Sequence, residues 1–407
     1  MRLCSVDLVN FRNYERLQLS FPGGTHIFYG QNAQGKTNLL EAIYLCTCAR
    51  SHRTGRDDEL IRRGEECYRA AVNFVTDRGL AESVSIEYRR SLGRNGAPAR
   101  IVRYNEVEIG RLADMMGLFH AILFAPEDLQ IVKDGPAERR RFLDILISRT
   151  DRSYFRDLQE FWKILAHRNR LLKYLRSREP RTLPGEADGG LPGPPRAQLD
   201  VWDEALASHA AAILEKRIHY LDLLSGYASL SLQHLTWSKE GLELHYKGLP
   251  GIGPGMDCKE IAPLYLERLL RSREDDLARG STSQGPHRDD IQILLNGSDA
   301  RVYASQGQQR SVVLALKIAE LTILTEITGE KPILLLDDVM SELDEARRSR
   351  LMEVIRDHHV FITCTDPGQI SQAGQTTPGC AAGWSGPVHY YLVKEGMAEP
   401  SEKPEAT

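Results

Sequence analysis

The chain has 407 residues, of which 42% are hydrophobic and 27% charged, and its formal net charge is −4. This composition is ordinary for a globular protein of about two or three domains. No apolar run is long enough for a transmembrane helix, and the first residues lack the apolar stretch of a signal peptide. The cysteines form no C-x₂-C pair, which favours free thiols in a reducing cytoplasm over zinc or disulfides.

A phosphate-binding loop is predicted near the N-terminus, between a strand at 26–29 and a helix at 37–43. The glycines of such a loop let backbone amides point at phosphate oxygens, and the helix N-terminus faces the anion. We expect Lys36 to reach the β- and γ-phosphates of ATP as a catalytic residue, and the Thr37 hydroxyl to hold Mg²⁺. The loop fits G-x-x-x-x-G-K-[ST] and comprises Gly30, Gln31, Asn32, Ala33, Gln34, Gly35, Lys36 and Thr37.

Two helices are predicted within the mainly helical stretch 131–245, because apolar residues there step by three and four positions. We expect the helices to pack antiparallel as short arms, with Asn169 fixing their register, although two amphipathic helices of a compact domain would show the same pattern. Between them, 177–197 contains five Pro and four Gly and is predicted to be a flexible linker. The two seams are Phe155, Leu158, Trp162, Leu165, Asn169 and Leu172, and Leu199, Trp202, Leu206, Ala210 and Ile213.

Positive charge is concentrated in one part of this otherwise acidic chain. Residues 139–181 contain thirteen Lys or Arg and five Asp or Glu, and a second basic cluster lies at 49–63. Such clusters could follow a phosphate backbone. The alternative is that they are solvated helix faces, with Arg139 to Arg141 paired to neighbouring acids or to the nucleotide.

A second anion site is predicted at Ser305, Gly307 and Gln308, just before an apolar helix at 311–320. A small hydroxyl, a glycine and a helix N-terminus together favour anion binding. The string 305–310 resembles the signature motif of ABC-type ATPases. In that family the motif caps the γ-phosphate held by a second protomer, so the resemblance implies an ATP-dependent homodimer.

An apolar strand at 331–336 ends in two carboxylates, Asp337 and Asp338. A continuous apolar run is typical of a strand inside a parallel sheet, and ligands bind at the carboxyl ends of such strands. We expect Asp337 to hold Mg²⁺ and Asp338 to orient or deprotonate the attacking water. Residues 341–344 resemble the D-loop of the same family. The next strand is predicted to end in Thr365, at the position where transporter ATPases carry a His.

The spacing of the motifs distinguishes branches of this superfamily, because Thr37 and Ser305 are 268 positions apart. Transporter ATPases keep this gap shorter, whereas SMC-like ATPases insert helical arms in it. The chain resembles the RecF family of bacterial SMC-like recombination ATPases in several further strings. These are residues 8–14, 124–129, 138–144 and 280–290.

The resemblance implies an α/β fold, an ABC-type (SMC-like) P-loop ATPase head with a mainly helical arm domain inserted between the Walker A and signature motifs. The expected domains are an ATPase lobe at 1–130, the arm at 131–245, the signature and Walker B part at 246–394, and a disordered tail at 395–407.

The resemblance also implies a cytoplasmic, ATP-gated dimeric clamp on duplex DNA or single-strand/double-strand junctions, acting in recombinational gap repair. Its expected partners are RecR and RecO and, indirectly, RecA, with roles in replication restart and the SOS response. We expect slow ATP hydrolysis, used as a switch, because an Asp stands at 338 where a Glu is usual. The alternative is an ATPase subunit of a membrane transporter; a chromosome rod is disfavoured because the arms are short.

Overall fold

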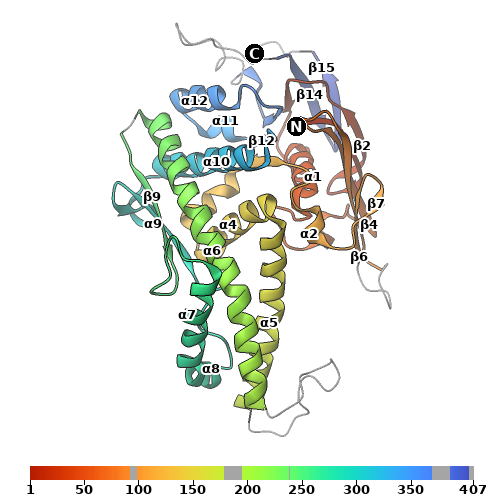
Figure 1. Cartoon of the computed structure of the whole chain (residues 1–407). Helices are drawn as coiled ribbons and strands as arrows, with labels where there is room; N and C mark the ends of the chain where they lie inside the picture. Colours follow the sequence, from red (N-terminus) through yellow and green to blue (C-terminus); the bar gives the residue numbers. More distant parts are fainter. Residues whose placement is uncertain (92–98, 178–194, 238, 369–385, 403–407) are drawn as a thin grey trace. The chain divides into compact units, whose positions relative to one another are not determined.

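The computed structural model describes residues 1–91, 99–177, 195–237, 239–368 and 386–402. Its contacts divide the chain into two compact units, each discontinuous in sequence (Figure 1). Unit 1 comprises Met1–Gln130, Tyr227–Gly241 and Ser305–Thr407, and unit 2 comprises Ile131–Gly226 and Leu242–Ala304. The predicted ranges 1–130, 131–245 and 246–394 stay predictions, and 178–194 of the expected linker lies outside the described residues.

Unit 1 contains a six-stranded sheet in the order β15-β14-β3-β13-β12-β8, parallel except for the pairing of β15 with β14. All five residues of β12 are buried, as expected of a strand inside a parallel sheet. The carboxyl ends of β3, β13, β12 and β8 therefore meet at one edge. The strands are β3 (Thr25–Tyr29), β8 (Ala121–Phe124), β12 (Ile333–Asp337), β13 (Val360–Cys364), β14 (Val388–Lys394) and β15 (Met397–Ser401).

A second six-stranded sheet in unit 1 is antiparallel, in the order β2-β1-β4-β5-β6-β7. Helix α1 (Lys36–Cys48), which follows the phosphate-binding loop, contacts strands of both sheets and is buried along most of its length. The strands are β1 (Arg2–Phe11), β2 (Tyr14–Ser20), β4 (Cys67–Val75), β5 (Ala81–Arg89), β6 (Ala99–Tyr104) and β7 (Val107–Glu108). The other helices wholly in this unit are η1 (Asp57–Leu60), α2 (Leu112–Met115), η3 (Pro126–Leu129), α10 (Gln306–Thr328), α11 (Val339–Glu342) and α12 (Glu345–Ile355).

Unit 2 combines helices with a three-stranded antiparallel sheet in the order β11-β10-β9. Its strands are β9 (Leu242–Lys247), β10 (Asp290–Leu295) and β11 (Ser298–Asp299). Its helices are α4 (Pro136–Thr150), α5 (Arg152–Arg176), α7 (Cys258–Arg271), α8 (Arg273–Arg279) and α9 (Ala300–Tyr303), and the division between units falls within α3 (Gln130–Lys133) and α6 (Pro195–Thr236). None of the described helices is both long and apolar enough to cross a bilayer.

Helices α5 and α6 pack antiparallel, as predicted (Figure 1). An ion pair joins Asp151 to Lys216 at 2.6 Å, and a hydrogen bond joins Asp157 to His209 at 3.1 Å, so residue numbers rise along α5 as they fall along α6. Asn169, however, accepts hydrogen bonds from the backbone N–H and the hydroxyl of Thr282, each at 2.7 Å. Because this side chain bonds a loop after α8 rather than α6, its predicted role in the seam register is wrong.

The expected disordered tail from residue 395 is also wrong in part. Glu395 and Gly396, with φ of 50° and 74°, form a two-residue turn into β15, which pairs with β14. The strand lies at a sheet edge, where a proline such as Pro400 is tolerated. Its short polar sequence gave no strand pattern, and residues 403–407 lie outside the described part.

Candidate nucleotide-binding site

The phosphate-binding loop leaves β3 and enters α1 through two glycines with left-handed φ, 146° at Gly30 and 119° at Gly35. A Cβ at Gly30 would lie 2.4 Å from the carbonyl oxygen of Val393, and one at Gly35 would lie 2.7 Å from the Asn13 amide nitrogen. Both the backbone conformation and the space therefore require glycine at these two positions.

Neighbouring segments hold the loop in place. The Asn13 side chain donates to the Gln34 carbonyl at 2.9 Å, and the Tyr14 hydroxyl donates to the Gly35 carbonyl at 3.0 Å. The side-chain oxygen of Gln34 accepts from the N–H of Glu395 at 2.7 Å. Gln34 thus anchors the loop to the turn between β14 and β15, a contact that sequence motifs gave no means of finding.

Lys36 lies where the loop meets α1, and its amine donates to the carbonyls of Gly30 and, at 3.0 Å, Gln31. Burial lowers the pKa of this amine, and nearby Cys364, Asp338 and Asp337 partly counter the effect. Phosphate oxygens are stronger acceptors for an ammonium group than carbonyls are. Lys36 is therefore placed to exchange its carbonyl partners for an anion.

A cavity of about 650 Å³ adjoins the outer side of the loop. This volume is in the range of small-molecule sites. Residues 31–33 are exposed on this loop. The lining residues are Tyr29, Gly30, Gln31, Asn32, Gln34, Thr365 and Leu392 to Glu395.

Asp337, at the end of β12, lies beside the first turn of α1. One of its carboxylate oxygens accepts from the Thr37 hydroxyl at 2.9 Å and from the Thr363 hydroxyl at 2.6 Å. The side chain is 5% exposed, and burial raises its pKa, although the two hydroxyls oppose the rise. A desolvated carboxylate with neutral hydroxyl donors fits a hard divalent cation, so Thr37 and Asp337 match the ligand types that Mg²⁺ prefers.

The adjoining Asp338 has a left-handed backbone, with φ of 53°. Its N–H donates to the Thr363 hydroxyl at 3.0 Å, and its carbonyl accepts from Ser341 at 2.7 Å. A non-glycine residue in this region of φ and ψ is uncommon and often found at functional sites. The structure thus fixes the backbone of Asp338 directly after Asp337, and its predicted role in orienting water stays a prediction.

The predicted second anion site is the N-terminus of α10. The Ser305 hydroxyl accepts from the Gln308 N–H at 3.3 Å, and the Gln308 side chain accepts from the Ser305 N–H at 2.8 Å, which is a capping box. Gln308 also donates to Glu240 at 2.8 Å. These contacts engage α10 and Glu240, so they do not bring Ser305 and Gln308 onto the phosphate-binding loop of the same chain. Near the position that a Cβ on Gly307 would take, the described residues outside its own helix place the Arg347 guanidinium, at 4.0 Å.

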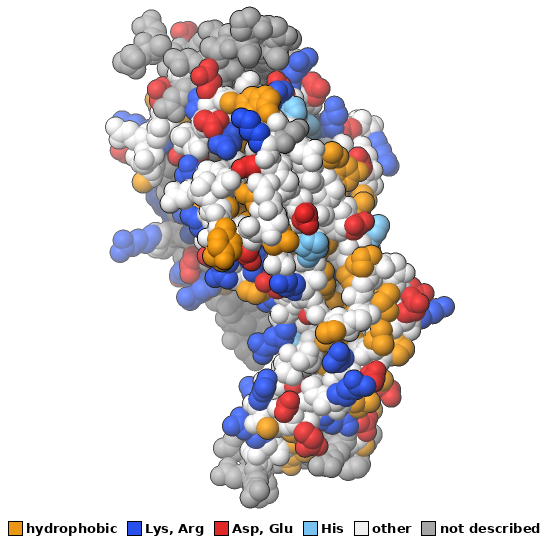
Figure 2. Space-filling view, turned by 90° about the vertical axis from the view of Figure 1, so that its left-hand side faces the viewer, with side chains coloured by type: hydrophobic (Ala, Val, Ile, Leu, Met, Phe, Trp, Pro, Cys, Tyr) orange, Lys and Arg blue, Asp and Glu red, His pale blue; other side chains and the backbone are white. Residues whose placement is uncertain are grey.

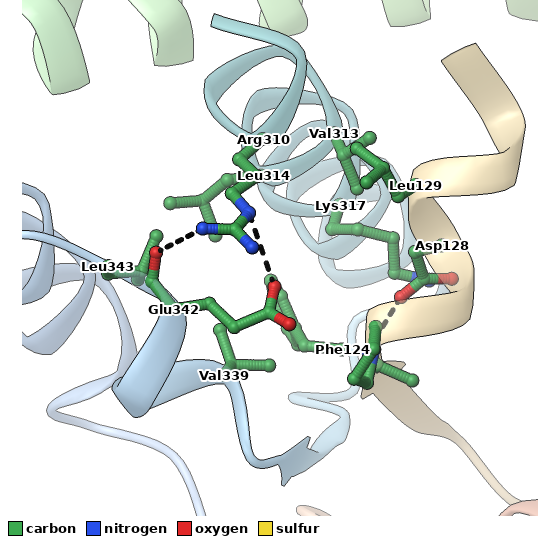
Figure 3. A pocket seen from close by; sticks show the side chains of 12 residues that line it. Phe124, Asp128, Leu129, Arg310, Val313, Leu314, Lys317, Val339, Glu342 and Leu343 are labelled. Carbon is green, nitrogen blue, oxygen red and sulfur yellow. Dashed lines mark hydrogen bonds and ion pairs between the residues drawn. The ribbon is translucent and has the colours of Figure 1, made fainter. Parts of the chain in front are cut away.

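Behind this helix end, Figure 3 shows a small pocket between α10, α11 and η3. Arg310 lies 3.5 Å from the Glu342 carboxylate and donates to the Glu342 carbonyl at 3.2 Å. Across the pocket, burial raises the pKa of Asp128 to about 6, while its carboxylate accepts from the Ala125 N–H at 2.8 Å. Arg310 therefore connects the second anion site to the segment that follows Asp338.

A buried glutamate in α1 was missed by sequence reasoning. Arg12 donates to both oxygens of Glu41, at 2.7 and 2.9 Å, and Ser51 donates to the same carboxylate. Burial alone would raise the pKa of Glu41, but the hydrogen bonds from Arg12 and Ser51 outweigh it and lower the pKa. The sequence feature that could have revealed this buried group is Glu41 itself, a lone acidic residue in an apolar helix.

The chain matches the protein family described as RecF/RecN/SMC N terminal domain over residues 2–381. It is 42% identical over 362 residues to a protein of Ruminiclostridium cellulolyticum named DNA replication and repair protein RecF, covering 89% of this chain and 92% of the relative.

The chain is also similar to solved structures that are described as RecF. One described as the recombination mediator protein RecF-ATP in the RecFOR pathway has a TM-score of 0.84 at 34% identity, covering 98% of each chain. The Smc head domain of Pyrococcus furiosus, bound to the C-terminal domain of ScpA, has a TM-score of 0.51 at 14% identity, covering 98% of this chain and 96% of that one. At that identity the likeness concerns the fold alone. These likenesses confirm the predicted ABC-type, SMC-like fold.

Proposed function

Since the chain belongs to the RecF family of SMC-like ATPases, we propose that it binds DNA under the control of ATP during recombinational gap repair. The observation that carries the proposal is the bond from Thr37 to the buried Asp337, because it joins the phosphate-binding loop to a desolvated carboxylate suited to Mg²⁺. The name DNA replication and repair protein RecF, carried by its relatives, supports the role in DNA repair. Family membership favours this function over a transporter subunit.

Residues of one protomer hold the nucleotide in this proposal. The backbone amides of 30–37 and the Lys36 amine bind the phosphates, and Thr37 and Asp337 hold Mg²⁺, which neutralises phosphate charge when bound. Asp338 orients the attacking water. The short Asp side chain favours slow turnover, so hydrolysis serves as a timing switch.

Residues of a second copy complete the site. Ser305, Gly307 and Gln308 bind the γ-phosphate in trans, and their position at the N-terminus of α10 supports this step. Loss of the γ-phosphate removes those contacts, so the dimer opens and releases DNA. The expected setting is cytoplasmic, with RecA loading, replication restart and SOS induction as outcomes. RecR and RecO are the expected partners, and the relative described within the RecFOR pathway supports these two.

A labelled gapped duplex tests the proposal by fluorescence anisotropy, titrated with protein in ATP and Mg²⁺, in ADP, and without nucleotide. We expect tight binding in ATP alone, with two protomers per DNA site. Absence of DNA binding in all three conditions would overturn the proposal.

The contribution of the second copy is tested by Ser305→Asp. Aspartate caps a helix as well as serine does, so α10 should stay folded, but its charge repels a γ-phosphate. We expect this variant to bind ATP as a monomer and to lose ATP-dependent dimerisation in analytical ultracentrifugation. Ser305→Asn, an equally good cap without the charge, is the control. Normal dimerisation of Ser305→Asp would contradict the shared site.

A further inference from the structure

The first turns of α10 carry the predicted γ-phosphate cap, at Ser305, Gly307 and Gln308, and also the side chain of Arg310. Arg310 follows Ser305 by five residues, which is about 7.5 Å along a helix that rises 1.5 Å per residue. Helix α10 is continuous and buried along much of its length. A ligand that displaces Ser305 and Gln308 therefore displaces Arg310 with them.

Arg310 holds the short helix α11, which begins directly after Asp338. Its guanidinium donates to the Glu342 carbonyl at 3.2 Å and lies 3.5 Å from the Glu342 carboxylate, as Figure 3 shows. Within this segment the Ser341 hydroxyl donates to the carbonyl of Asp338 at 2.7 Å. A helix of four residues has little stability of its own, so its position depends on such contacts. Arg310 thus helps to place the residue that is predicted to orient water.

The contact between Arg310 and Glu342 is loose in this structure. The Nε atom of Arg310 is buried and has no hydrogen-bond partner within the part of the chain that the structure describes, although the Glu342 carboxylate is 3.5 Å away. A pocket of about 50 Å³ beside the two side chains leaves room for movement. Because a buried donor without a partner costs free energy, a shift of α10 that closes this distance is favourable.

Ion pairs on the protein surface are common, and the face shown in Figure 2 carries acidic and basic side chains interspersed. Most such pairs contribute little to stability. The pair of Arg310 and Glu342 differs because it joins two elements that each carry residues of the proposed site. Arg350, by contrast, pairs with Glu353 inside α12 at 2.9 Å, which makes it a suitable control.

We propose that Arg310 is a positioning residue that couples the nucleotide held by the second copy to Asp338 of its own chain. When Ser305 and Gln308 engage the γ-phosphate of the other protomer, α10 shifts and Arg310 tightens on Glu342. Asp338 then takes the position from which it orients water, so hydrolysis at each site requires nucleotide at both. The inference rests on the proposed function and adds a means of regulating the same site.

The first test is Arg310→Met, which removes both contacts to Glu342. The two side chains are 39% and 33% exposed, so the variant should fold normally, which urea denaturation checks. We expect ATP affinity, ATP-dependent dimerisation and KM to stay as in the wild-type protein, while kcat for ATP hydrolysis falls about tenfold or more. Arg310→Lys keeps a donor for the Glu342 carbonyl and should recover part of the lost kcat.

Arg350→Met is the matched control, because it removes a cation of the same unit without separating α10 from α11. We expect its kcat to equal that of the wild-type protein. An unchanged kcat in Arg310→Met, or an equal loss in the control, would overturn the inference. A raised KM with unchanged kcat would mean that Arg310 binds nucleotide directly, and it would overturn the inference too.

Mixed dimers show on which chain Arg310 acts. Asp338→Asn inactivates one site, and an excess of this variant brings nearly every copy of a second chain into mixed dimers. When the second chain is Arg310→Met, the remaining active site lacks its own Arg310, and we expect hydrolysis to fall about tenfold. When Arg310→Met is placed in the Asp338→Asn chain instead, the wild-type second chain should hydrolyse ATP as fast as it does beside Asp338→Asn alone.

The reverse pattern would mean that Arg310 acts on the nucleotide of the other copy, and it would overturn the inference, as would equal rates in the two mixtures. Absence of ATP hydrolysis by the wild-type protein, or full hydrolysis by Asp338→Asn alone, would instead overturn the proposed function.

Discussion

Two buried charged groups, one in each unit, have hydrogen-bond partners of different kinds. In unit 2, Arg168 is fully buried and bonds Asp203 at 2.5 Å and Asp276 at 2.8 Å, while Arg273 lies 2.5 Å from Asp203. Two cations thus balance these two buried carboxylates, and Arg273 also pairs with the exposed Asp200 at 2.7 Å. In unit 1, both hydrogen bonds described for Asp337 come from neutral hydroxyls.

The difference separates a structural charge from a charge that we propose to bind a ligand. A buried cation that is paired with carboxylates has little reason to exchange them, whereas a desolvated carboxylate that bonds neutral hydroxyls gains from binding a cation. A change at Arg168 should therefore affect folding strongly, whereas a change at Asp337 should affect mainly ligand binding.

The largest effect on folding is expected from Arg168→Met. The substitution leaves Asp203 and Asp276 buried with an uncompensated charge, which costs about 3–5 kcal/mol of the free energy of unfolding. Urea denaturation followed by circular dichroism measures the loss. Lys163→Met, on the exposed side of the same helix, should change stability by less than about 0.5 kcal/mol. A loss below about 1 kcal/mol for Arg168→Met would mean that the cluster is solvated.

Two buried histidines extend the comparison to neutral groups. His26 and His359 lie 3.0 Å apart between ring nitrogens. Burial, with the other ring adding a smaller effect, lowers the pKa of His26 to about 3, and burial lowers that of His359 to about 4. Both rings are neutral in the folded chain, while the unfolded chain binds protons near pH 6.5.

The stability that depends on these two neutral rings should therefore be fully present above pH 6.5 and should be lost as the pH drops toward 4. The expected loss is about 2 kcal/mol per histidine between pH 6.5 and 4.5. Thermal unfolding across this range measures it, with His26→Phe as the comparison. A variant whose acid sensitivity equals that of the wild-type protein would rule out this pair as the cause.

A smaller effect on stability is expected when Asn169 is substituted. The two interpretations of this residue predict stability changes of opposite sign. If the residue sat in a helical seam, Asn169→Leu would stabilise the fold. Since Asn169 accepts from the N–H and hydroxyl of Thr282, we expect the leucine variant to lose about 1–2 kcal/mol. Asn169→Asp keeps an acceptor and should lose less. Chemical denaturation of the two variants distinguishes the alternatives.

The sequence predicted those groups whose role is specified by neighbouring residues in the chain. The order of glycines, Lys36 and Thr37 specifies a phosphate loop, and an apolar run before Asp337 specifies a buried strand, so the family and fold followed. What remained hidden depends on partners distant in sequence: Gln34 bonds residue 395, and Arg168 bonds residue 276. Helical periodicity places a side chain on a face, but it cannot identify the third element that covers that face, as Thr282 does for Asn169.

The smallest effect on folding, and the sharpest test of the comparison, is Asp337→Asn. Burial raises the pKa of this carboxyl above its ordinary value of 3.8, so the ionised form is disfavoured in the fold and stability falls as the pH rises past that value. The asparagine oxygen still accepts from Thr37 and Thr363. We expect the variant to be as stable as the wild-type protein or up to about 1 kcal/mol more stable at pH 7.

Its affinity for ATP in Mg²⁺ should nevertheless fall on the order of a hundredfold, while binding without metal should change little. Isothermal titration calorimetry and urea denaturation of the same preparation measure both quantities. A stable variant with impaired binding would mean that the fold tolerates the buried charge because the ligand requires it. A loss of about 3 kcal/mol in stability would mean that the fold itself needs Asp337, as it needs Arg168.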